Sequence, residues 1–148
     1  MKTSENGIRL IKHHEGVRNR PYRCPAGLWT VGVGHLIGDG KSLPESWNKT
    51  FTTEEIDGLL KRDLNRFELG VCRMLHPLRL KQSEFDALVS FSFNLGLGTL
   101  QRSTVRQALL RGDKAMASES LLKYCKAGGK ILKGLQIRRQ DEYKLLML

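Results

Sequence analysis

The sequence contains no long hydrophobic run. No apolar stretch within its 148 residues approaches the roughly 18 residues that a transmembrane helix needs. The first twelve residues, MKTSENGIRLIK, also lack the apolar core of a secretory signal peptide. We find no internal repeat and no low-complexity segment. These absences argue against a membrane-spanning or exported precursor, and we expect the chain to fold in the cytoplasm.

Cysteine is scarce, and the three cysteines, Cys24, Cys72 and Cys125, lie far apart. An odd number at these spacings predicts neither a disulfide framework nor a zinc site. We therefore expect reduced thiols, no metal and no cofactor. Free cysteine usually behaves as a small buried hydrophobic residue, which is our expectation for Cys72 and Cys125.

Acidic residues are also in short supply, since 15 of them face 25 lysines and arginines and leave a formal net charge of +10. A field of this sign attracts polyanions such as nucleic acid, an anionic membrane surface or the acidic polymers of a bacterial envelope. The composition, 40% hydrophobic and 27% charged, is that of a globular protein with one sizeable core rather than of a disordered chain. Charge alone does not choose among these partners.

The first part of the chain changes its periodicity. Residues 4–15 predict a short helix that Ser4 or Asn6 caps and Gly16 ends. Residues 21–38 contain two prolines and a PAG turn, and the stretch LWTVGVGHL alternates like a strand. On this strand one face would carry Trp29, Val31 and Val33, and the opposite face Thr30, Gly32 and Gly34.

From residue 52 the pattern is almost entirely helical. Thr52 and Glu55 form a capping box, and the apolar positions of the following helix are Ile56, Leu59, Leu60, Leu64, Phe67 and Val71. A second helix, capped near Ser83 and ended by the glycines at 96–98, is apolar around much of its girth and should be buried. Shorter helices are expected at about 103–111 and 114–125, a loop at 127–130, and a last helix from about residue 135.

These elements predict an α+β fold in a single domain, 1–148. A helix and a small β lobe would occupy about residues 1–51, and a linking helix about 52–75. A helical lobe would follow over about 76–148.

Three chemically useful groups surround the predicted hairpin. Glu15 ends the first helix on its apolar stripe, where apolar neighbours and the helix dipole would disfavour the ionised carboxylate. A carboxylic acid that stays protonated near neutral pH can act as a general acid. Thr30 shares its strand face with glycines only, which leaves room for a flat ligand, although glycines also permit tight strand packing. A turn would bring Cys24 next to Thr30, so these three groups could frame one site.

The spacing of these groups resembles the phage lysozymes, the muramidase endolysins of the T-even and lambdoid type. Their signature is a Glu, eight residues, an Asp or Cys, five residues, and a Thr in TxGxGH; here it reads Glu15, Cys24 and Thr30 within TVGVGH. The segment QSEFDALVSFSFNLGLG, residues 82–98, is similar to the central helix of that family. AGGKILKGLQIRRQDE, residues 127–142, is similar to its C-terminal segment. The resemblance covers nearly the whole chain.

The resemblance implies a lysozyme-like fold with a cleft between its lobes. It also implies hydrolysis of the bond between N-acetylmuramic acid and N-acetylglucosamine in peptidoglycan. Glu15 would protonate the leaving oxygen, and Thr30 would position the attacking water. Cys24 stands where the best-known members have Asp, and its thiolate, favoured by nearby arginines, could activate the water or attack the anomeric carbon itself. The family precedent favours the first route, with inversion.

Further residues receive roles from the same resemblance. Gly32 and Gly34 would contact the substrate, and Asn94 and Gly96 would line the cleft opposite them. Either Arg138 or Arg139 would reach Glu15 and tune it. We expect His35 to be structural, hydrogen-bonded or ion-paired between the lobes.

The resemblance also implies partners and a location. The chain would be a monomer that binds the glycan strand of peptidoglycan and is drawn by charge to the anionic envelope surface. It would wait in the bacterial cytoplasm until a holin opens the membrane. No specific nucleic acid is expected.

Four other functions could draw on the same residues. A basic helical nucleic-acid module would use the net charge, but the basic residues are scattered and no DNA-binding motif occurs. GHLIGDGKS, residues 34–42, fails the phosphate-loop spacing because His35 stands where the first glycine belongs. A cysteine peptidase built on Cys24 and His35 would leave Glu15 and Thr30 without a role. Added membrane disruption by the basic segment 123–144 stays an open alternative.

Overall fold

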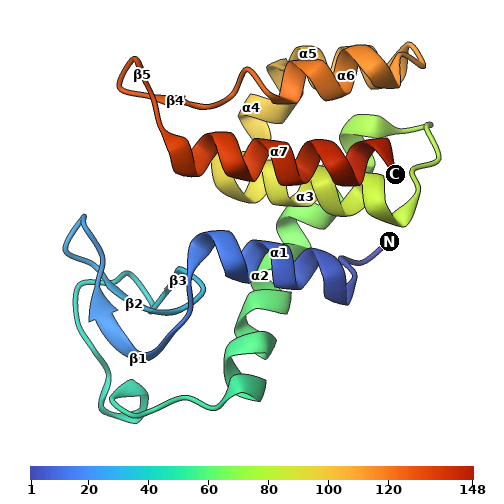
Figure 1. Ribbon diagram of the computed structural model, residues 1–148. Helices are drawn as coiled ribbons and strands as arrows, with labels where there is room; N and C mark the ends of the chain where they lie inside the picture. The colour runs from blue at the N-terminus through green and yellow to red at the C-terminus, as the bar shows by residue number, and fades with distance from the viewer. The chain divides into compact units, whose positions relative to one another are not determined.

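The computed structural model describes residues 1–148 and divides them into two compact units. The β unit comprises Lys12–Asn65, and the helical unit comprises Met1–Ile11 together with Arg66–Leu148. Two helices, α1 (Glu5–Glu15) and α2 (Thr53–Leu75), each contribute to both units. The fold is α+β as predicted, dominated by helices and with two small antiparallel sheets (Figure 1).

The β unit is built around a three-stranded antiparallel sheet in the order β1-β2-β3. Its strands are β1 (Arg18–Arg23), β2 (Trp29–Gly32) and β3 (His35–Leu36). The prediction of one continuous strand through LWTVGVGHL is therefore wrong. Gly32 and Gly34 have φ angles of 70° and 69°, a left-handed conformation that glycine adopts without strain, and the chain reverses between them. Val31 consequently pairs with His35 across the turn.

The start of α2 follows the predicted capping box. The Thr52 hydroxyl accepts a hydrogen bond from the Glu55 amide at 3.1 Å, and the Glu55 carboxylate accepts one from the Thr52 amide at 2.9 Å. All six predicted apolar positions of this helix are buried. The loop before α2, predicted as irregular, contains the short 3-10 helix η1 (Glu45–Trp47).

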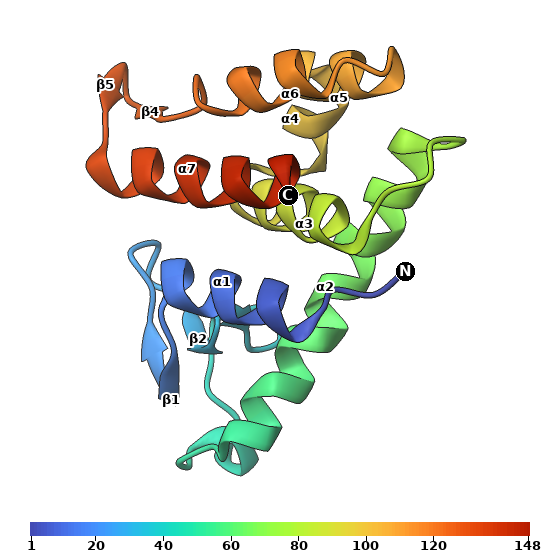
Figure 2. The ribbon, with the colours of Figure 1, turned by 45° about the vertical axis from the view of Figure 1, so that its right-hand side comes forward.

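The helical unit is centred on α3 (Gln82–Leu95), whose residues 84–92 are all buried, as the apolar pattern predicted. The helix is capped at Lys81 rather than near Ser83, because the Glu84 carboxylate accepts a hydrogen bond from the Lys81 amide at 2.7 Å. Helix α7 (Lys133–Met147) lies alongside α3 in both views (Figures 1 and 2). The remaining helices are α4 (Leu97–Arg102), α5 (Thr104–Leu110) and α6 (Lys114–Leu121).

Two elements of this unit were not predicted. Helix α4 begins directly after Gly96, which ends α3 with a φ of 94°. The expected loop at 127–130 is a hairpin of β4 (Lys126–Ala127) and β5 (Lys130–Ile131), whose turn glycines both have positive φ. Two-residue strands carry too little sequence for a period-2 pattern to become visible.

The three cysteines lie in different environments. Cys125 is buried, as expected, but Cys72 is exposed, so its assignment to the core was wrong. Cys72 follows the buried Val71 on α2 and falls on the solvent side of the helix. None of the helices combines the length and the apolar character that would let it cross a membrane.

Candidate active site

Glu15 is the last residue of α1 and is exposed. The expectation that apolar neighbours surround its carboxylate is wrong. The buried side of α1 consists of Gly7, Ile8 and Ile11, and the last turn that follows is basic. The apolar stripe thus ends one turn before Glu15. Gly16 terminates the helix with a φ of 82°, and its amide donates to the Lys12 carbonyl at 2.9 Å.

Cys24 and Thr30 lie together on the hairpin of β1 and β2, as the sequence predicted. The strand register pairs Tyr22 with Thr30, which places Cys24 just beyond the last strand pair. The Cys24 amide donates to the Leu28 carbonyl at 2.9 Å, and the Gly27 amide donates to the Cys24 carbonyl at 2.7 Å. Thr30 is buried, whereas Cys24 is partly exposed. The hairpin therefore presents a sulfur with a buried hydroxyl beside it.

The hairpin also changes the acidity of the thiol. A hydrogen bond from the backbone of Leu28 is the largest influence and lowers the pKa of Cys24 below its ordinary value. Partial desolvation opposes this, and the Ala26 backbone and the Thr30 hydroxyl lower the pKa further. The single hydroxyl proton of Thr30 has two acceptors, the Leu28 carbonyl at 2.9 Å and the thiolate. It can turn to the sulfur when Cys24 ionises.

The two candidate glycines on this sheet have different surroundings. Gly32 is buried, and a Cβ atom added to it would lie 3.2 Å from Cγ2 of Ile56 on α2. Its face of the strand is therefore packed, and the expected open surface for a flat ligand is wrong at this residue. Gly34 is exposed at the turn, where an added Cβ would meet nothing within 4 Å.

His35 belongs to the β unit, and its contacts lie within that unit. Its Nδ1 lies 2.8 Å from Oδ2 of Asp63 on α2, and its ring stacks on Trp47 with centroids 5.8 Å apart. Because both partners belong to the β unit, the expectation that this histidine joins two lobes is wrong. It fixes the loop before α2 against the sheet and the helix.

Asn94, Gly96, Arg138 and Arg139 all belong to the helical unit. The Asn94 side-chain oxygen accepts a hydrogen bond from Nη2 of Arg139 at 2.7 Å, and the side chain is half-buried. Gly96, also half-buried, ends α3. The substrate contacts expected of Asn94 and Gly96 stay predictions.

Arg138 and Arg139 are almost completely buried, at 3% and 0% exposure. Both contact Glu142, which is itself fully buried: Arg139 Nε lies 2.8 Å from Oε1, and Arg138 Nε lies 3.4 Å from Oε2. Ser90 on α3 donates to Oε2 at 2.5 Å. Burial is the largest influence on both charges, raising the pKa of Glu142 and lowering the pKa of Arg139, and the contact between them offsets part of each change.

Glu142 and Ser90 were not singled out from the sequence. The available signal was spacing, since Arg139 and Arg138 precede Glu142 by three and four residues, the separations at which side chains meet on a helix. The spacing cannot show that this face of α7 lies against α3, which turns a surface pair into a buried network.

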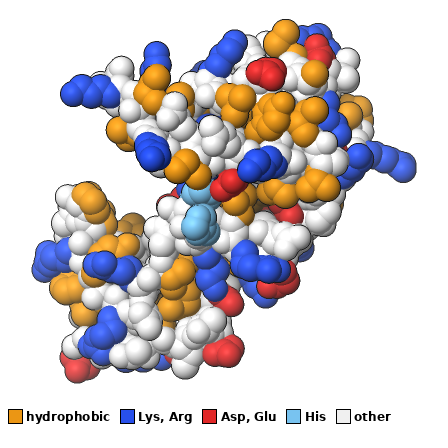
Figure 3. Space-filling view, viewed as in Figure 1, with side chains coloured by type: hydrophobic (Ala, Val, Ile, Leu, Met, Phe, Trp, Pro, Cys, Tyr) orange, Lys and Arg blue, Asp and Glu red, His pale blue; other side chains and the backbone are white.

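Lysines and arginines are dispersed over the face shown in Figure 3 and form no single continuous patch there. This distribution agrees with the scattering of basic residues along the sequence. The structure gathers no group of three or more His, Cys, Asp or Glu side chains that could hold a metal ion.

Comparison with known proteins supports one family throughout. The model of the phage lysozyme family matches residues 12–142. The endolysin of Bacillus phage B103 is 38% identical over 149 residues, which cover 99% of this chain and 54% of that protein. This chain thus spans about half the length of that relative.

Two solved structures share the fold over nearly their full length. A variant of P22 lysozyme superposes with a TM-score of 0.87 and is 34% identical, over 100% of this chain and 99% of that chain. The muramidase domain of SpmX from Asticaccaulis excentricus superposes with a TM-score of 0.85 and is 32% identical, over 99% and 98% of the two chains. The resemblance inferred from the sequence is confirmed, the fold is lysozyme-like, and the chain belongs to the phage lysozyme family.

Proposed function

We propose that this chain is a muramidase of the endolysin type. It hydrolyses the β-1,4 bond between N-acetylmuramic acid and N-acetylglucosamine in peptidoglycan and so lyses bacterial cells. Membership of the phage lysozyme family supports the reaction class and the substrate. The signature residues Glu15, Cys24 and Thr30 support the assignment of roles.

The observation that carries the proposal is the acidified thiol of Cys24 beside the Thr30 hydroxyl. A second group that accepts a proton from water is what the reaction needs in addition to an acid. Backbone hydrogen bonds of the turn lower the pKa of Cys24, so a larger fraction of it is thiolate near neutral pH than for a free cysteine. A buried cysteine in an apolar setting would have the opposite property.

In the proposed reaction, Glu15 donates its proton to the glycosidic oxygen as the bond to the anomeric carbon breaks. Water attacks that carbon, and the Cys24 thiolate takes the proton that the water loses. Thr30, whose proton can turn to the thiolate, orients the water through its oxygen lone pairs. Exchange with solvent then returns the proton to Glu15, so no cofactor is consumed.

Additional residues have supporting roles in this proposal. Gly34, exposed at the turn of β2 and β3, allows the glycan to approach the backbone closely. Asn94 and Gly96 contact sugar substituents. Arg138 or Arg139 tunes Glu15, in addition to the buried contacts with Glu142 described above.

The decisive experiment replaces the proposed acid. Glu15→Gln should abolish release of reducing sugars from purified peptidoglycan while circular dichroism shows that the protein still folds, because the transferable proton is lost. Glu5→Gln, the same change at the exposed start of the same helix, is the matched control and should keep its activity. Activity at the control's level in Glu15→Gln would refute the assignment of Glu15. Clearing of permeabilised cells that persists in this variant would indicate membrane disruption instead.

The product identifies the reaction. Digestion in oxygen-18 water should incorporate one heavy oxygen at the new reducing end, whereas an anhydro-sugar product would mean that no water takes part. Proton NMR of the first product should show the α-anomer, since a water activated by Cys24 attacks the face opposite the leaving group. Retention of the β configuration would instead mean direct attack by the thiolate.

Cys24 has its own pair of variants. Cys24→Asp should keep much of the activity, because a carboxylate can accept the same proton. Cys24→Ser should lose most of it, because a hydroxyl is far less acidic than this thiol. Full activity in Cys24→Ser would remove Cys24 from the mechanism.

For access to the wall, we propose that a monomer waits in the bacterial cytoplasm and is released by a holin, and that its net positive charge of +10 draws it to the anionic envelope. Expression with and without a holin gene tests this route. Lysis without the holin gene would refute it.

A further inference from the structure

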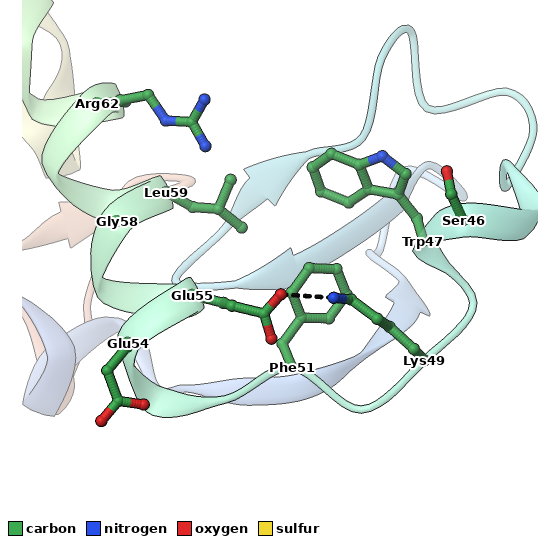
Figure 4. Close-up of a pocket in the computed structure, with 9 residues that line it drawn as sticks. All are labelled: Ser46, Trp47, Lys49, Phe51, Glu54, Glu55, Gly58, Leu59 and Arg62. Atoms are coloured by element: carbon green, nitrogen blue, oxygen red, sulfur yellow. Dashed lines mark hydrogen bonds and ion pairs between the residues drawn. The ribbon is translucent and has the colours of Figure 1, made fainter.

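The β unit contains a hollow that none of the proposed catalytic residues lines. It encloses about 370 Å³, a volume within the range of small-ligand sites. Its walls come from the loop around η1 and from the first turns of α2, and Figure 4 shows their side chains around a common space. They are Ser46, Trp47, Lys49, Phe51, Glu54, Glu55, Gly58, Leu59 and Arg62. Glu15, Cys24 and Thr30 are not among them.

The aromatic wall of this hollow is held in place before any ligand arrives. The Trp47 ring stacks on His35 at an angle of 9°, and His35 is in turn fixed by Asp63 at 2.8 Å. The Phe51 ring is buried and lies 5.5 Å from the Trp47 ring at a tilt of 43°. Ring faces that are already ordered can contact an apolar surface of a ligand at little further entropic cost.

The charges around the hollow leave one cation without a counter-charge. Lys49 is paired with Glu55 at 2.5 Å and lies over the Phe51 ring, so its charge is satisfied. Glu54 points away from the enclosed space, whereas the guanidinium of Arg62 extends toward it (Figure 4). The structure gives Arg62 no hydrogen bond or ion pair with any protein group. A planar guanidinium in this position suits a carboxylate, which it can bind through two parallel hydrogen bonds.

A glycine keeps the floor of the hollow clear. Gly58 lies within α2, where glycine costs about 1 kcal/mol relative to alanine. Neither packing nor backbone conformation requires it, because an added Cβ would meet nothing within 4 Å and its φ is not positive. Any larger side chain at this position would project into the hollow instead. A helical glycine without a structural reason is explained if the space serves a ligand.

We propose that this hollow binds a sugar ring that carries a carboxylate. The carbon–hydrogen face of the ring would lie against Trp47 and Phe51, and the carboxylate would bind Arg62. The Ser46 hydroxyl would contact the hydroxyl groups of the ring. The inference rests on the proposed function only in the choice of probe: N-acetylmuramic acid is a sugar of the proposed substrate and, as the free sugar, carries the carboxylate that Arg62 would bind.

The test measures binding of single sugars, which the enzyme cannot cleave. In nitrogen-15 NMR spectra the indole N–H signals of Trp47 and Trp29 are separate reporters, the second lying on β2 next to Thr30. N-acetylmuramic acid should shift the Trp47 signal saturably and leave the Trp29 signal in place. N-acetylglucosamine, which lacks the carboxylate, should bind at least about tenfold more weakly. Equal binding of both sugars, or a shift of Trp29 alone, would overturn the proposal.

Two variants with matched controls locate the bound sugar. Arg62→Gln should weaken binding of N-acetylmuramic acid about tenfold, whereas Lys61→Gln, which removes the same charge from the next exposed residue, should not. Gly58→Leu should fill the hollow and abolish binding. Gly134→Leu, at another helical glycine with open space, should leave binding unchanged. Binding that survives Gly58→Leu in a folded protein would overturn the proposal.

The proposed function and this inference can fail separately. Glu15→Gln should bind N-acetylmuramic acid with wild-type affinity at the Trp47 reporter, whatever its effect on lysis. If Glu15→Gln still cleaves peptidoglycan, the catalytic assignment fails and the hollow is unaffected. If lysis is abolished but Trp47 does not respond to the sugar in any variant, the hollow fails alone.

Discussion

Replacement of Glu142 by glutamine should be among the most destabilising single changes in this protein. Glu142 is fully buried on α7, and its carboxylate contacts both buried guanidiniums, those of Arg138 and Arg139. Glutamine preserves the shape of the side chain but carries no charge. Glu142→Gln would therefore leave two cations inside the helical unit without that counter-charge.

The expected loss follows from this geometry. Removing one partner from a buried ion pair typically costs about 3–5 kcal/mol, because an uncompensated charge stays buried. The hydrogen bond from Ser90 at 2.5 Å survives as a weaker bond to the amide oxygen, so its contribution is only partly lost. For a chain of 148 residues, about 3 °C is lost for each kcal/mol. The melting temperature should thus fall by about 9–15 °C.

Urea denaturation followed by circular dichroism measures this loss as a change in the midpoint at constant slope. Glu119→Gln, the same substitution at an exposed position of α6, is the control and should change stability by less than about 0.5 kcal/mol. A loss below about 1 kcal/mol in Glu142→Gln would refute the reasoning. It would mean that Glu142 is not the counter-charge that keeps Arg138 and Arg139 inside the protein.

Three further outcomes test other parts of the structure. In a Cys72→Ser background, iodoacetamide should alkylate Cys24 at a lower pH than it alkylates free cysteine, because turn hydrogen bonds lower the pKa of this thiol; a rate profile equal to that of free cysteine would contradict this. Gly32→Ala should lower the free energy of unfolding in urea by about 1–3 kcal/mol, because a φ of 70° is strained for alanine and the new Cβ would lie 3.2 Å from Cγ2 of Ile56 on α2. An unchanged urea midpoint would show that the strand relaxes to accommodate the side chain. Burial is the largest single influence on Glu84 and would raise its pKa, but the hydrogen bonds with Lys114 and the Lys81 backbone and the charges of both lysines together outweigh it and lower the pKa. The stabilisation by Glu84 is therefore present above the ordinary pKa of glutamate and is lost as the pH falls through the lowered one. Glu84→Gln should accordingly cost about 1–3 kcal/mol at neutral pH and much less in acid, and an equal cost at both would refute the linkage.

Much of the helical framework could be predicted from the sequence because its signals are local. The capping box of Thr52 and Glu55 and the apolar stripe of α2 lie within consecutive turns of one helix. The buried character of α3 follows from its composition alone. By contrast, the β4–β5 hairpin and helix α4 are too short to produce a period.

The strand prediction failed for a reason that the sequence contained. Alternation through LWTVGVGHL indicates a strand, but Gly32 and Gly34 also permit the left-handed backbone that a turn requires. The turn requirement of the glycines therefore overrides the hydrophobic period. Burial of Gly32 against Ile56 depends on a contact with a helix more than twenty positions away, which no local pattern reveals.

In the candidate site, too, some features are set by a local pattern and others are not. The position and the acidity of Cys24 are both set within seven consecutive residues, 24–30, because the turn that brings the sulfur to Thr30 also supplies the backbone hydrogen bonds that favour its thiolate. A short motif can therefore specify this part of the chemistry, and Cys24→Asp should retain function without any other change. Glu15 is different, since the buried face of α1 ends at Ile11, one turn before it. The local pattern of α1 thus does not specify the role of this acid, and Glu15→Gln should abolish lysis while the alkylation profile of Cys24 stays unchanged.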